Sequence, residues 1–536
     1  MNRKNLTAAV LAGLAGTAGI ASTVQAVNLN PDGLGQVLIY PYYTVNGGNL
    51  TLLSVVNTSE DAKAVKVRFL EGQNSQEVLD FNLYMSAYDV WTAAIVDDDG
   101  TPTLKIDDST CTVPYLYRDF GGSQPFLTSR LALDGGSTDI SRTSEGHFEM
   151  IEMGTLVNGG PYVDANMGSA DAATHVTVDG VRGPSDCDQL IAAWTQGPDG
   201  DPNSSDDGYW LNPDYGPLTD IDDPSGGLFG GAAIINIAGG AMYSYDARAI
   251  NGYAYSALTD TGPLHSFPGT EKPSLNDGDS YTGYVFTDTG VVASASFLEG
   301  VDAVSYVFMH DAIMNEYNID PDLGASSEWV VTFPTKNFYV NSVEAKPPFT
   351  DVWSDHDGDD VNDGACEAVL LDSVWDREEL NIDQSTTGED CPPVVSPGEV
   401  QCGTPAKPFE LCYETNVIRF GATDTIPGET EIFGSKNFTN FDPLTFTSGW
   451  ARIDLMAYAQ GNVGAESIVL RPPLYDWEDG GAQWGLPVTG FWAMRVANAF
   501  LGDGADVLAN YGGLFNHKAT RCFSGEACRI DLLGLN

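Results

Sequence analysis

Basic residues are scarce in this chain, which has 24 lysines and arginines against 75 aspartates and glutamates among its 536 residues. The formal net charge of −51 excludes nucleic acids and anionic membranes as expected partners, because like charges repel. Hydrophobic residues make up 42% of the chain and aromatic residues 10%, which is too much apolar material for a disordered acidic polymer. We therefore interpret the charge as a means of staying soluble in a salty medium.

Long apolar runs are absent beyond the N-terminus, so no membrane span is expected in the mature chain. The first residues differ: Arg3 and Lys4 precede an uncharged apolar stretch over 6–21, and Val24-Gln25-Ala26 has the small-x-small form of a cleavage site. The stretch is shorter than the roughly 20 residues that span a bilayer. We predict a signal peptide over 1–26 and a secreted or cell-surface protein, with the periplasm as the alternative compartment.

Catalytic and nucleotide-binding motifs are absent as well. The sequence has no HExxH zinc motif, no GxSxG nucleophile elbow and no phosphate-binding or dinucleotide-binding glycine loop. His147 with Glu149 and Glu152 could ligate a metal, but an ordinary polar strand face is the favoured interpretation. We expect no enzymatic activity. An extracellular polysaccharide hydrolase stays an alternative, because a glycosidase pair of carboxylates is recognised only by its separation in space.

Cysteine is limited to eight residues. An even number in an exported chain predicts disulfides, because that compartment is oxidising. No CxxC is present, so neither a zinc ribbon nor a thioredoxin-type site is indicated. Spacing does not determine connectivity, but short loops suggest two local pairs, and two further pairs then remain. In that order the suggested pairs are Cys402–Cys412, Cys522–Cys528, Cys366–Cys391 and Cys111–Cys187.

The sequence does contain a succession of β-strand patterns. Residues 64–69 (AVKVRF) alternate apolar and polar side chains, as a half-buried strand does, and residues 79–85 repeat the pattern after a turn. With the apolar segments 50–56 and 90–95 they give four strand patterns about ten residues apart, a spacing typical of an immunoglobulin-like sandwich. The predicted fold class is mainly β: immunoglobulin-like β-sandwich domains with long disulfide-stapled loops and few short helices. The best helix candidates are residues 303–317 and 502–510.

The domain organisation is predicted from where these patterns recur. Alternation returns near the C-terminus, so residues 27–100 and 440–536 are expected to form one discontinuous sandwich, which is feasible when domain ends lie close together at the surface. Residues 101–343 are then one or more inserted β domains, and 344–410 form a loop segment rich in cysteine, aspartate and proline. Residues 411–439 connect this segment to the closing strands.

Several segments resemble known bacterial surface modules. TLLSVVNTS over 51–59 and VKVRFLEG over 65–72 resemble the opening strands of immunoglobulin-like modules in bacterial surface proteins, and GWARI over 449–453 with PVTGF over 487–491 resembles their closing strands. The whole mature chain is similar to a group of exported proteins of Gram-negative bacteria that have no assigned activity. The segments that carry this second resemblance are 145–154, 329–336 and 511–515. The resemblance implies a sandwich fold and export, and it brings no catalytic residues.

The sharpest local motif is the acidic run DHDGDDVND over 355–363. Carboxylates at relative positions 1, 3, 5 and 9 have the spacing of a calcium loop, in which a backbone carbonyl at position 7 adds an oxygen. The run resembles the aspartate loops of thrombospondin-type calcium repeats, but it departs from the EF-hand pattern, because Gly358 stands at position 4 and Cys366 at position 12. A solvated acidic turn is the alternative. The predicted calcium ligands are Asp355, Asp357, Asp359, Val361, Asp363 and Glu367.

Two aromatic residues, Tyr42 and Trp477, are candidates for stacking on a sugar or a protein partner, although strand aromatics are more often core residues. The sequence as a whole favours a secreted or cell-surface structural or interaction protein that self-assembles, as a surface-layer or filament subunit does. The alternatives are a carbohydrate-binding adhesin and the polysaccharide hydrolase. The expected partners are copies of the chain itself or a surface glycan, and the expected cofactor is calcium.

Overall fold

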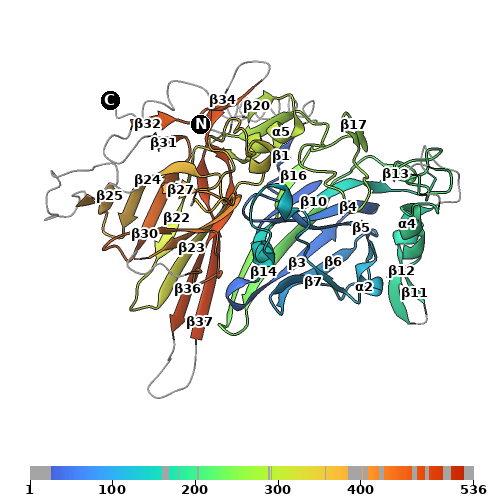
Figure 1. Cartoon of the computed structure of the whole chain (residues 1–536), viewed down its shortest axis with the longest axis horizontal. Coiled ribbons are helices and arrows are strands. Elements are labelled where there is room, and N and C mark those ends of the chain that lie inside the picture. The colour runs from blue at the N-terminus through green and yellow to red at the C-terminus, as the bar shows by residue number, and fades with distance from the viewer. Residues whose placement is uncertain are drawn as a thin grey trace, which may run out of the picture.

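A computed structural model shows a chain that is mainly β with short helices, as the sequence predicts (Figure 1). The structure describes residues 26–159, 168–178, 180–198, 200–201, 204–287, 290, 292–356, 358–383, 401–402, 409–421, 428–460, 467–476, 482–498 and 509–523. The predicted signal peptide lies almost entirely outside these residues. No helix within the described segments is long and apolar enough to cross a membrane.

Two sheets form the N-terminal half, which lies on the right in Figure 1. The first sheet contains, in order, β1 (Asn28–Leu29), β16 (Arg248–Asn251), β2 (Val37–Thr44), β10 (Glu145–Leu156), β4 (Ala62–Glu71), β5 (Glu77–Met85) and β8 (Cys111–Val113), with β13 (Ile221–Asp222) beside β10. The second sheet contains β15 (Ala241–Asp246), β14 (Leu228–Asn236), β3 (Asn49–Asn57), β6 (Val90–Asp98), β7 (Thr101–Lys105) and β9 (Ser123–Pro125).

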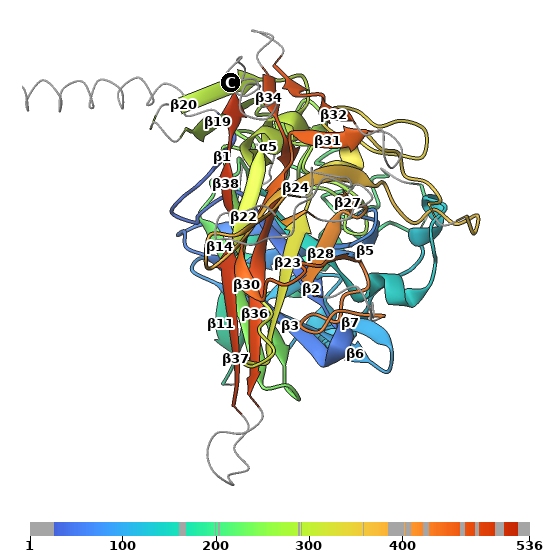
Figure 2. The same ribbon diagram turned by 90° about the vertical axis from the view of Figure 1, so that its left-hand side faces the viewer.

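Two further sheets form the C-terminal half, which faces the viewer in Figure 2. The third sheet contains β26 (Gln401–Cys402), β25 (Asn381–Asp383), β24 (Glu367–Asp376), β30 (Ser448–Asp454), β22 (Ala312–Asn318) and β38 (Lys518–Thr520), with β27 (Phe409–Leu411) also paired to β24. The fourth sheet contains β29 (Phe438–Phe441), β28 (Thr415–Phe420), β23 (Ala325–Thr332), β36 (Thr489–Asn498) and β37 (Ala509–Asn516).

Short elements complete the described fold. The small strands are β11 (His175–Val178), β12 (Val181–Pro184), β17 (Leu258–Thr259), β18 (Gly262–Pro263), β19 (Thr282–Phe286), β20 (Val292–Ser296), β21 (Met309–His310), β31 (Ala457–Gln460), β32 (Ser467–Leu470), β33 (Leu474–Tyr475), β34 (Ala482–Trp484), β35 (Leu486–Pro487) and β39 (Cys522–Phe523). The α-helices are α2 (Leu116–Asp119), α3 (Ser169–Ala173), α4 (Cys187–Ala193) and α5 (Gly300–Phe308). The 3₁₀ turns are Asn46–Gly48, Leu131–Leu133, Ile140–Ser144 and Lys336–Phe338.

The helix predicted over 303–317 is only partly correct. Helix α5 ends at Phe308, and residues 312–318 form β22, which pairs with both β30 and β38. Tertiary pairing therefore overrides the local pattern here. Most of the other candidate helix, 502–510, lies outside the described residues.

The first sheet is covered on both of its faces, and this explains why β4 is buried along its whole length. Val65, Val67 and Phe69 pack in the core shared with the second sheet. Alternation places Lys66 and Arg68 on the opposite face, but they too are buried, because the chain around Tyr253 to Asp277 packs there. The alternating pattern thus correctly predicted a strand, but the polar face of β4 packs against other parts of the protein and does not face water.

The predicted discontinuous sandwich, 27–100 plus 440–536, is not formed. Strand β3 pairs with β14 and β6, and β4 pairs with β10 and β5, so the opening strands find their partners within the N-terminal half. Strand β30 pairs with β22 and β24 instead. The inserted segment 101–343 is also divided, because β10, β14, β15 and β16 complete the first half while β22 and β23 build the second. Alternation identifies a strand but does not name its partner.

The two halves share an apolar core. Tyr245 of β15 stacks on Phe491 of β36, with ring centroids 5.2 Å apart. Thr332 of β23 donates a 2.6 Å hydrogen bond to the carbonyl of Pro41 in β2. The fourth sheet thus packs on both of its faces, one against the third sheet and the other against the N-terminal half.

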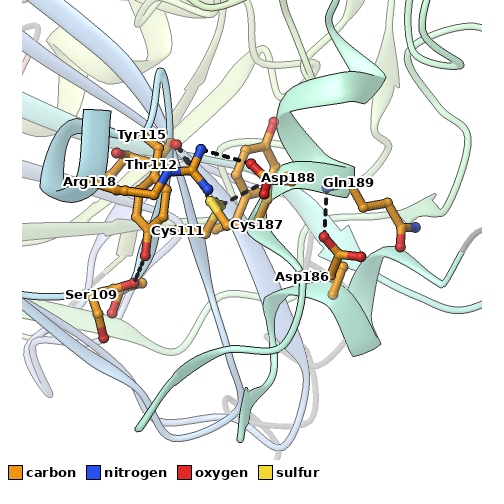
Figure 3. Close-up of a disulfide and its surroundings, with 12 residues drawn as sticks. Ser109, Cys111, Thr112, Tyr115, Arg118, Asp186, Cys187, Asp188 and Gln189 are labelled. Carbon is orange, nitrogen blue, oxygen red and sulfur yellow. Dashed lines mark hydrogen bonds and ion pairs between the residues drawn. A yellow bond between two sulfur atoms is a disulfide. The ribbon is translucent and has the colours of Figure 1, made fainter. Parts of the chain in front are cut away.

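Disulfides staple the loops, as predicted, but one pairing differs from the prediction. Cys111–Cys187 is present and joins β8 to the start of α4, where Arg118 also reaches Asp188 (Figure 3). Cys366 bonds to Cys412, so the suggested pairs Cys366–Cys391 and Cys402–Cys412 are wrong. The reason is the pairing of β24 with β27, which places Glu367 opposite Leu411 and so brings their neighbours together.

The remaining cysteines fall at the limits of the described chain. Cys522 is disulfide-bonded, to a partner outside the described side chains. Cys391 and Cys528 lie outside the described residues, so the pair Cys522–Cys528 stays a prediction.

Candidate functional site

The predicted calcium loop is closed by its own backbone. The Asp355 carboxylate accepts hydrogen bonds from the amides of Gly358 and Asp360, at 2.6 and 2.8 Å. Asp359 accepts from the amide of Val361, and Asp363 accepts from the amide of His356. Asp357 lies outside the described residues. These are the contacts of an acidic turn, and calcium binding at this loop stays a prediction.

Glu367 is not part of that loop, contrary to the prediction. It opens β24 as a fully buried residue, its carboxylate is paired with Arg471, and it accepts hydrogen bonds from the backbone amides of Thr350 and Asp351. The acidic and histidine side chains that do converge are Asp351 and His356, with Cys366 beside them. Cys366 is in a disulfide, so it is not a metal ligand here.

Tyr42, proposed as an exposed binding residue, is fully buried. Strand β2 is central in the first sheet, and the Tyr42 hydroxyl donates a 2.9 Å hydrogen bond to Glu145. Burial and the negative charge of Glu145 raise the pKa of Tyr42 above its usual value. The other candidate, Trp477, lies outside the described residues.

The His147 group is a set of buried structural charges. Burial, and then the nearby Arg68 guanidinium, lower the pKa of His147 to about 3, so its imidazole is neutral. Glu149 pairs with Arg68 at 2.5 Å, and Glu152 pairs with Lys63 at 2.7 Å. The polar strand face expected from the sequence is therefore an interior layer of ion pairs, and its carboxylates are occupied by cations of the chain itself.

A cleft at one end of the C-terminal half has the character of a ligand site. Its volume is about 540 Å³. We name it the aromatic cleft; it is lined by Glu316, Tyr317, Asn318, Asp376, Arg377, Ser448, Gly449, Trp450, Trp492, Met494 and Phe515. Its lining residues come from strands of the third and fourth sheets and from the residues that follow β24.

The opening of the cleft follows from strand register. Strand β38 pairs with β22 only through Ala312, Ile313 and Met314, and it leaves the rest of β22 as an open edge. Strand β30 continues along β22 as far as the pair Asn318–Ser448. The third sheet is therefore narrower at this end than the fourth sheet below it.

Two pairs of aromatic rings belong to this region. Trp375 and Trp450 are direct cross-strand partners, with ring centroids 6.2 Å apart and nearly parallel planes. Trp492 and Phe515 are direct partners in the fourth sheet, with centroids 5.0 Å apart. Trp450 is 40% exposed and Phe515 is 50% exposed, so each pair offers an aromatic surface to solvent.

Polar groups border the aromatic surfaces. Glu316 lies directly opposite Trp450 on β22, and Arg377 follows the end of β24. Both are exposed, and neither side chain has a hydrogen bond or ion pair within the described part of the chain. Asp376, by contrast, is occupied by the backbone amides of Glu378 and Leu380. The cleft thus combines flat apolar surfaces with an available carboxylate and an available guanidinium.

This site was missed by the sequence interpretation, which singled out Tyr42 and Trp477. Trp375, Trp450, Trp492 and Phe515 come from four strands separated by up to 140 residues in sequence, from position 375 to position 515. Each is a plausible core residue when its strand is considered alone. Only the register of the strands shows which aromatic side chains are neighbours.

A second surface feature is the outer face of the second sheet. A shallow hollow of about 710 Å³ runs across it, over small side chains such as Ser54, Ala94 and Ala233. Apolar side chains border the hollow in register: Val90, Val56 and Phe229 form one row across the strands, and Leu52 lies in another. Leu52, Val90, Phe229 and Met242 are 41, 48, 42 and 55% exposed.

Comparisons with known proteins found no match: no protein-family model, no curated protein and no solved structure matches this chain.

Proposed function

We propose that this protein is an exported binding protein that holds a carbohydrate chain in the aromatic cleft. The observation that carries the proposal is the pair of partly exposed aromatic surfaces, from Trp375–Trp450 and Trp492–Phe515, around one cleft with free polar groups at its border. Ligand sites in proteins commonly combine aromatic walls with a few polar groups that fix orientation.

Sugar rings fit this combination of groups. A pyranose presents an apolar face of C–H groups, which packs on a flat aromatic ring, and a border of hydroxyl groups that need hydrogen-bonding partners. Glu316 accepts such hydrogen bonds, Arg377 donates them, and both are available. The formal net charge of −51 disfavours a polyanionic glycan, so the proposed ligand is a neutral or weakly charged polysaccharide.

The test is a glycan array followed by titration calorimetry on the chain from residue 27 onward. We expect Trp450→Ala and Phe515→Ala each to weaken binding about tenfold, which corresponds to about 1.4 kcal/mol per ring. Phe286→Ala is the matched control, because Phe286 is 56% exposed on β19 and does not line the cleft. Equal affinity in all three variants would remove the cleft from consideration.

The same purified protein tests the enzymatic alternative. Release of reducing ends from a bound polysaccharide, lost in Glu316→Gln, would make the protein a hydrolase and would contradict a purely binding role. A bound glycan that stays intact over hours supports the proposal.

Self-association is a second candidate function, and the outer face of the second sheet favours it. Leu52, Val90, Phe229 and Met242 are apolar and exposed on one sheet face. Apolar patches of this kind commonly mark interaction surfaces. We propose a second copy of the chain as the occupant, in keeping with a structural role at the cell surface.

Sedimentation velocity over a range of concentrations tests this second candidate. We expect oligomers in the wild type and a shift toward monomer in Leu52→Asp, because a buried charge at the contact is costly. Val343→Asp is the control, since Val343 is 86% exposed and lies in the other half. A wild type that stays monomeric at the highest concentration would refute self-association through this face.

A further inference from the structure

One partly buried arginine among the described residues lacks the carboxylate partner that an acidic chain should readily provide. Carboxylate partners are present for most of the described arginines, among them Arg68, Arg118, Arg130, Arg142, Arg419, Arg452, Arg471 and Arg495. Arg521 donates to the backbone carbonyls of Met309 and Val307, and Arg182 and Arg377 are exposed. Arg248 is partly buried, and its guanidinium has neither a hydrogen bond nor an ion pair within the described part of the chain.

Arg248 lines a small, partly open cavity where the two halves meet. The cavity has a volume of about 40 Å³, and its polar lining consists of Arg248, His310, Thr489, Asn516 and His517. Arg248 is the first residue of β16 in the first sheet, whereas the other four belong to the C-terminal half. A single water needs roughly 10–15 Å³ of such space, so the cavity holds a few waters or one small ion and excludes organic molecules of ordinary size.

The two histidines of the cavity are neutral. His517 Nε2 lies 2.9 Å from the carbonyl oxygen of Val330, and its Nδ1 lies 3.2 Å from the side-chain Nδ2 of Asn315. Because a carbonyl accepts and an amide N–H donates, Nε2 carries the proton. Burial lowers the pKa of His517 to about 4. Burial, together with Arg521 and then Arg248, also lowers the pKa of His310.

No carboxylate of the described chain lines this cavity. Asp311, next in sequence to His310, accepts a hydrogen bond from Thr520 and lies 3.8 Å from Arg452. Burial lowers the pKa of Arg248, and no acidic side chain opposes that effect. The cavity therefore contains one full positive charge, two neutral imidazoles, a hydroxyl and an amide. This is the donor set of an anion site, since a partly buried cation is costly unless an anion accompanies it.

We propose that this cavity binds one monovalent anion of about the size of chloride, held by the Arg248 guanidinium with Thr489 and Asn516 as neighbouring donors. The anion joins β16 of the N-terminal half to β36 and β37 of the C-terminal half, and so it contributes to the stability of their junction. Binding acts on the folded state alone, so stability rises with the concentration of the anion. The site is independent of the aromatic cleft.

Thermal unfolding tests the proposal in sodium chloride and in sodium gluconate at equal ionic strength, because gluconate is too large for the cavity. We expect the wild type to melt about 1–2 °C higher in chloride once the site is filled. Arg248→Gln removes this difference, whereas Arg182→Gln, which changes an exposed arginine, retains it. An equal chloride effect in Arg248→Gln would overturn the proposal.

The ³⁵Cl resonance gives a second readout that does not depend on the variant folding well. The wild type should broaden the chloride line, and bromide, which fits the same site, should reverse the broadening. A wild-type linewidth that bromide leaves unchanged would overturn the proposal. Stabilisation by formate and not by chloride would also overturn it, because the ligand would then be a carboxylate.

Discussion

Arg68 lies between two carboxylates, Glu77 and Glu149, on the covered face of the first sheet. Burial by itself would lower the pKa of Arg68, but Glu149 and Glu77 outweigh it and raise that pKa above its usual value. The guanidinium is therefore charged in the interior, and its stability there depends on keeping both partners. A charge of this kind is costly when one partner is removed.

We predict that Glu149→Ala lowers the free energy of unfolding by about 3–5 kcal/mol, because it leaves the Arg68 charge buried without one of its partners. Urea denaturation measures the loss. Asp98→Ala is the control, because Asp98 forms an exposed pair with Lys105 at 2.6 Å, and such pairs contribute at most about 1 kcal/mol. Equal losses in the two variants would contradict the assignment of the buried pair as a structural requirement.

Glu328 gives a prediction about pH. Burial raises the pKa of Glu328 to about 7, although the amides of Ile432 and Phe433 partly oppose that shift. Since the folded pKa exceeds the unfolded value, the folded state binds more protons between about pH 4.5 and pH 7. The contribution of Glu328 to stability is thus fully present below about pH 4.5 and is lost as the pH rises to 7. We expect Glu328→Gln to gain on the order of 2–3 kcal/mol relative to wild type over this range.

Urea midpoints of the two proteins, measured at several pH values, check this prediction. Glu429→Gln is the control, since Glu429 is exposed and directly precedes Thr430, which donates a hydrogen bond to Glu328. A constant difference between wild type and Glu328→Gln from pH 4.5 to pH 7 would show that Glu328 does not titrate in this window.

At the scale of elements, the loop over 430–437 is held by carboxylates from both halves. Glu328 of β23 accepts from Thr430, Ile432 and Phe433. Glu145 of β10 accepts from Ser435 and from the amides of Lys436 and Asn437. One loop therefore ties the first sheet to the fourth sheet.

Two glycine backbones approach each other closely at this loop. Gly434 has a φ of +65°, and a Cβ there would lie 2.4 Å from the backbone nitrogen of Gly47. We predict that Gly434→Ala costs about 2–5 kcal/mol, the sum of a strained φ and a forced separation of the two backbones. Gly33→Ala separates the two causes, because Gly33 has a φ of +75° but open space around it, and only about 1–2 kcal/mol is expected there. Chemical denaturation of both variants gives the comparison, and equal costs would mean that the close approach is unimportant.

The positions of the strands could be predicted from the sequence, but the strands with which they pair could not. The strand patterns at 50–56, 64–69, 79–85 and 90–95 all fall within strands of the structure, because alternation reports local geometry directly. Which strands or cysteines pair depends on segments that are far apart in the sequence. The predicted strand partner of β30 and the predicted disulfide partner of Cys366 were therefore both wrong. The aromatic cleft could not be predicted for the same reason, since its aromatic side chains become neighbours only through register. Burial of Tyr42 reflects the covering of the first sheet on both faces, which no local pattern reports.

At the scale of the whole molecule, the shared core makes the two halves interdependent. Phe491 of β36 is buried and contacts the rings of Tyr245 and Phe433. We predict that Phe491→Ala lowers stability by about 3–5 kcal/mol and reduces amide hydrogen-exchange protection in β14 and β15 as well as in β23. The exposed Phe286→Ala should stay within about 0.5 kcal/mol of wild type. Loss of protection confined to the fourth sheet would show that the halves open separately.

The Glu145 contacts have a consequence for the order in which the chain acquires its structure. Ser435, which supplies one of the partners of Glu145, follows it by 290 residues. During synthesis, the strands of the N-terminal sheets are made long before the loop that satisfies this buried carboxylate. Until that loop is made, the Glu145 carboxylate has to stay solvated. Contacts between residues so far apart in sequence slow folding. The N-terminal half therefore reaches its final structure only after most of the polypeptide has been synthesised.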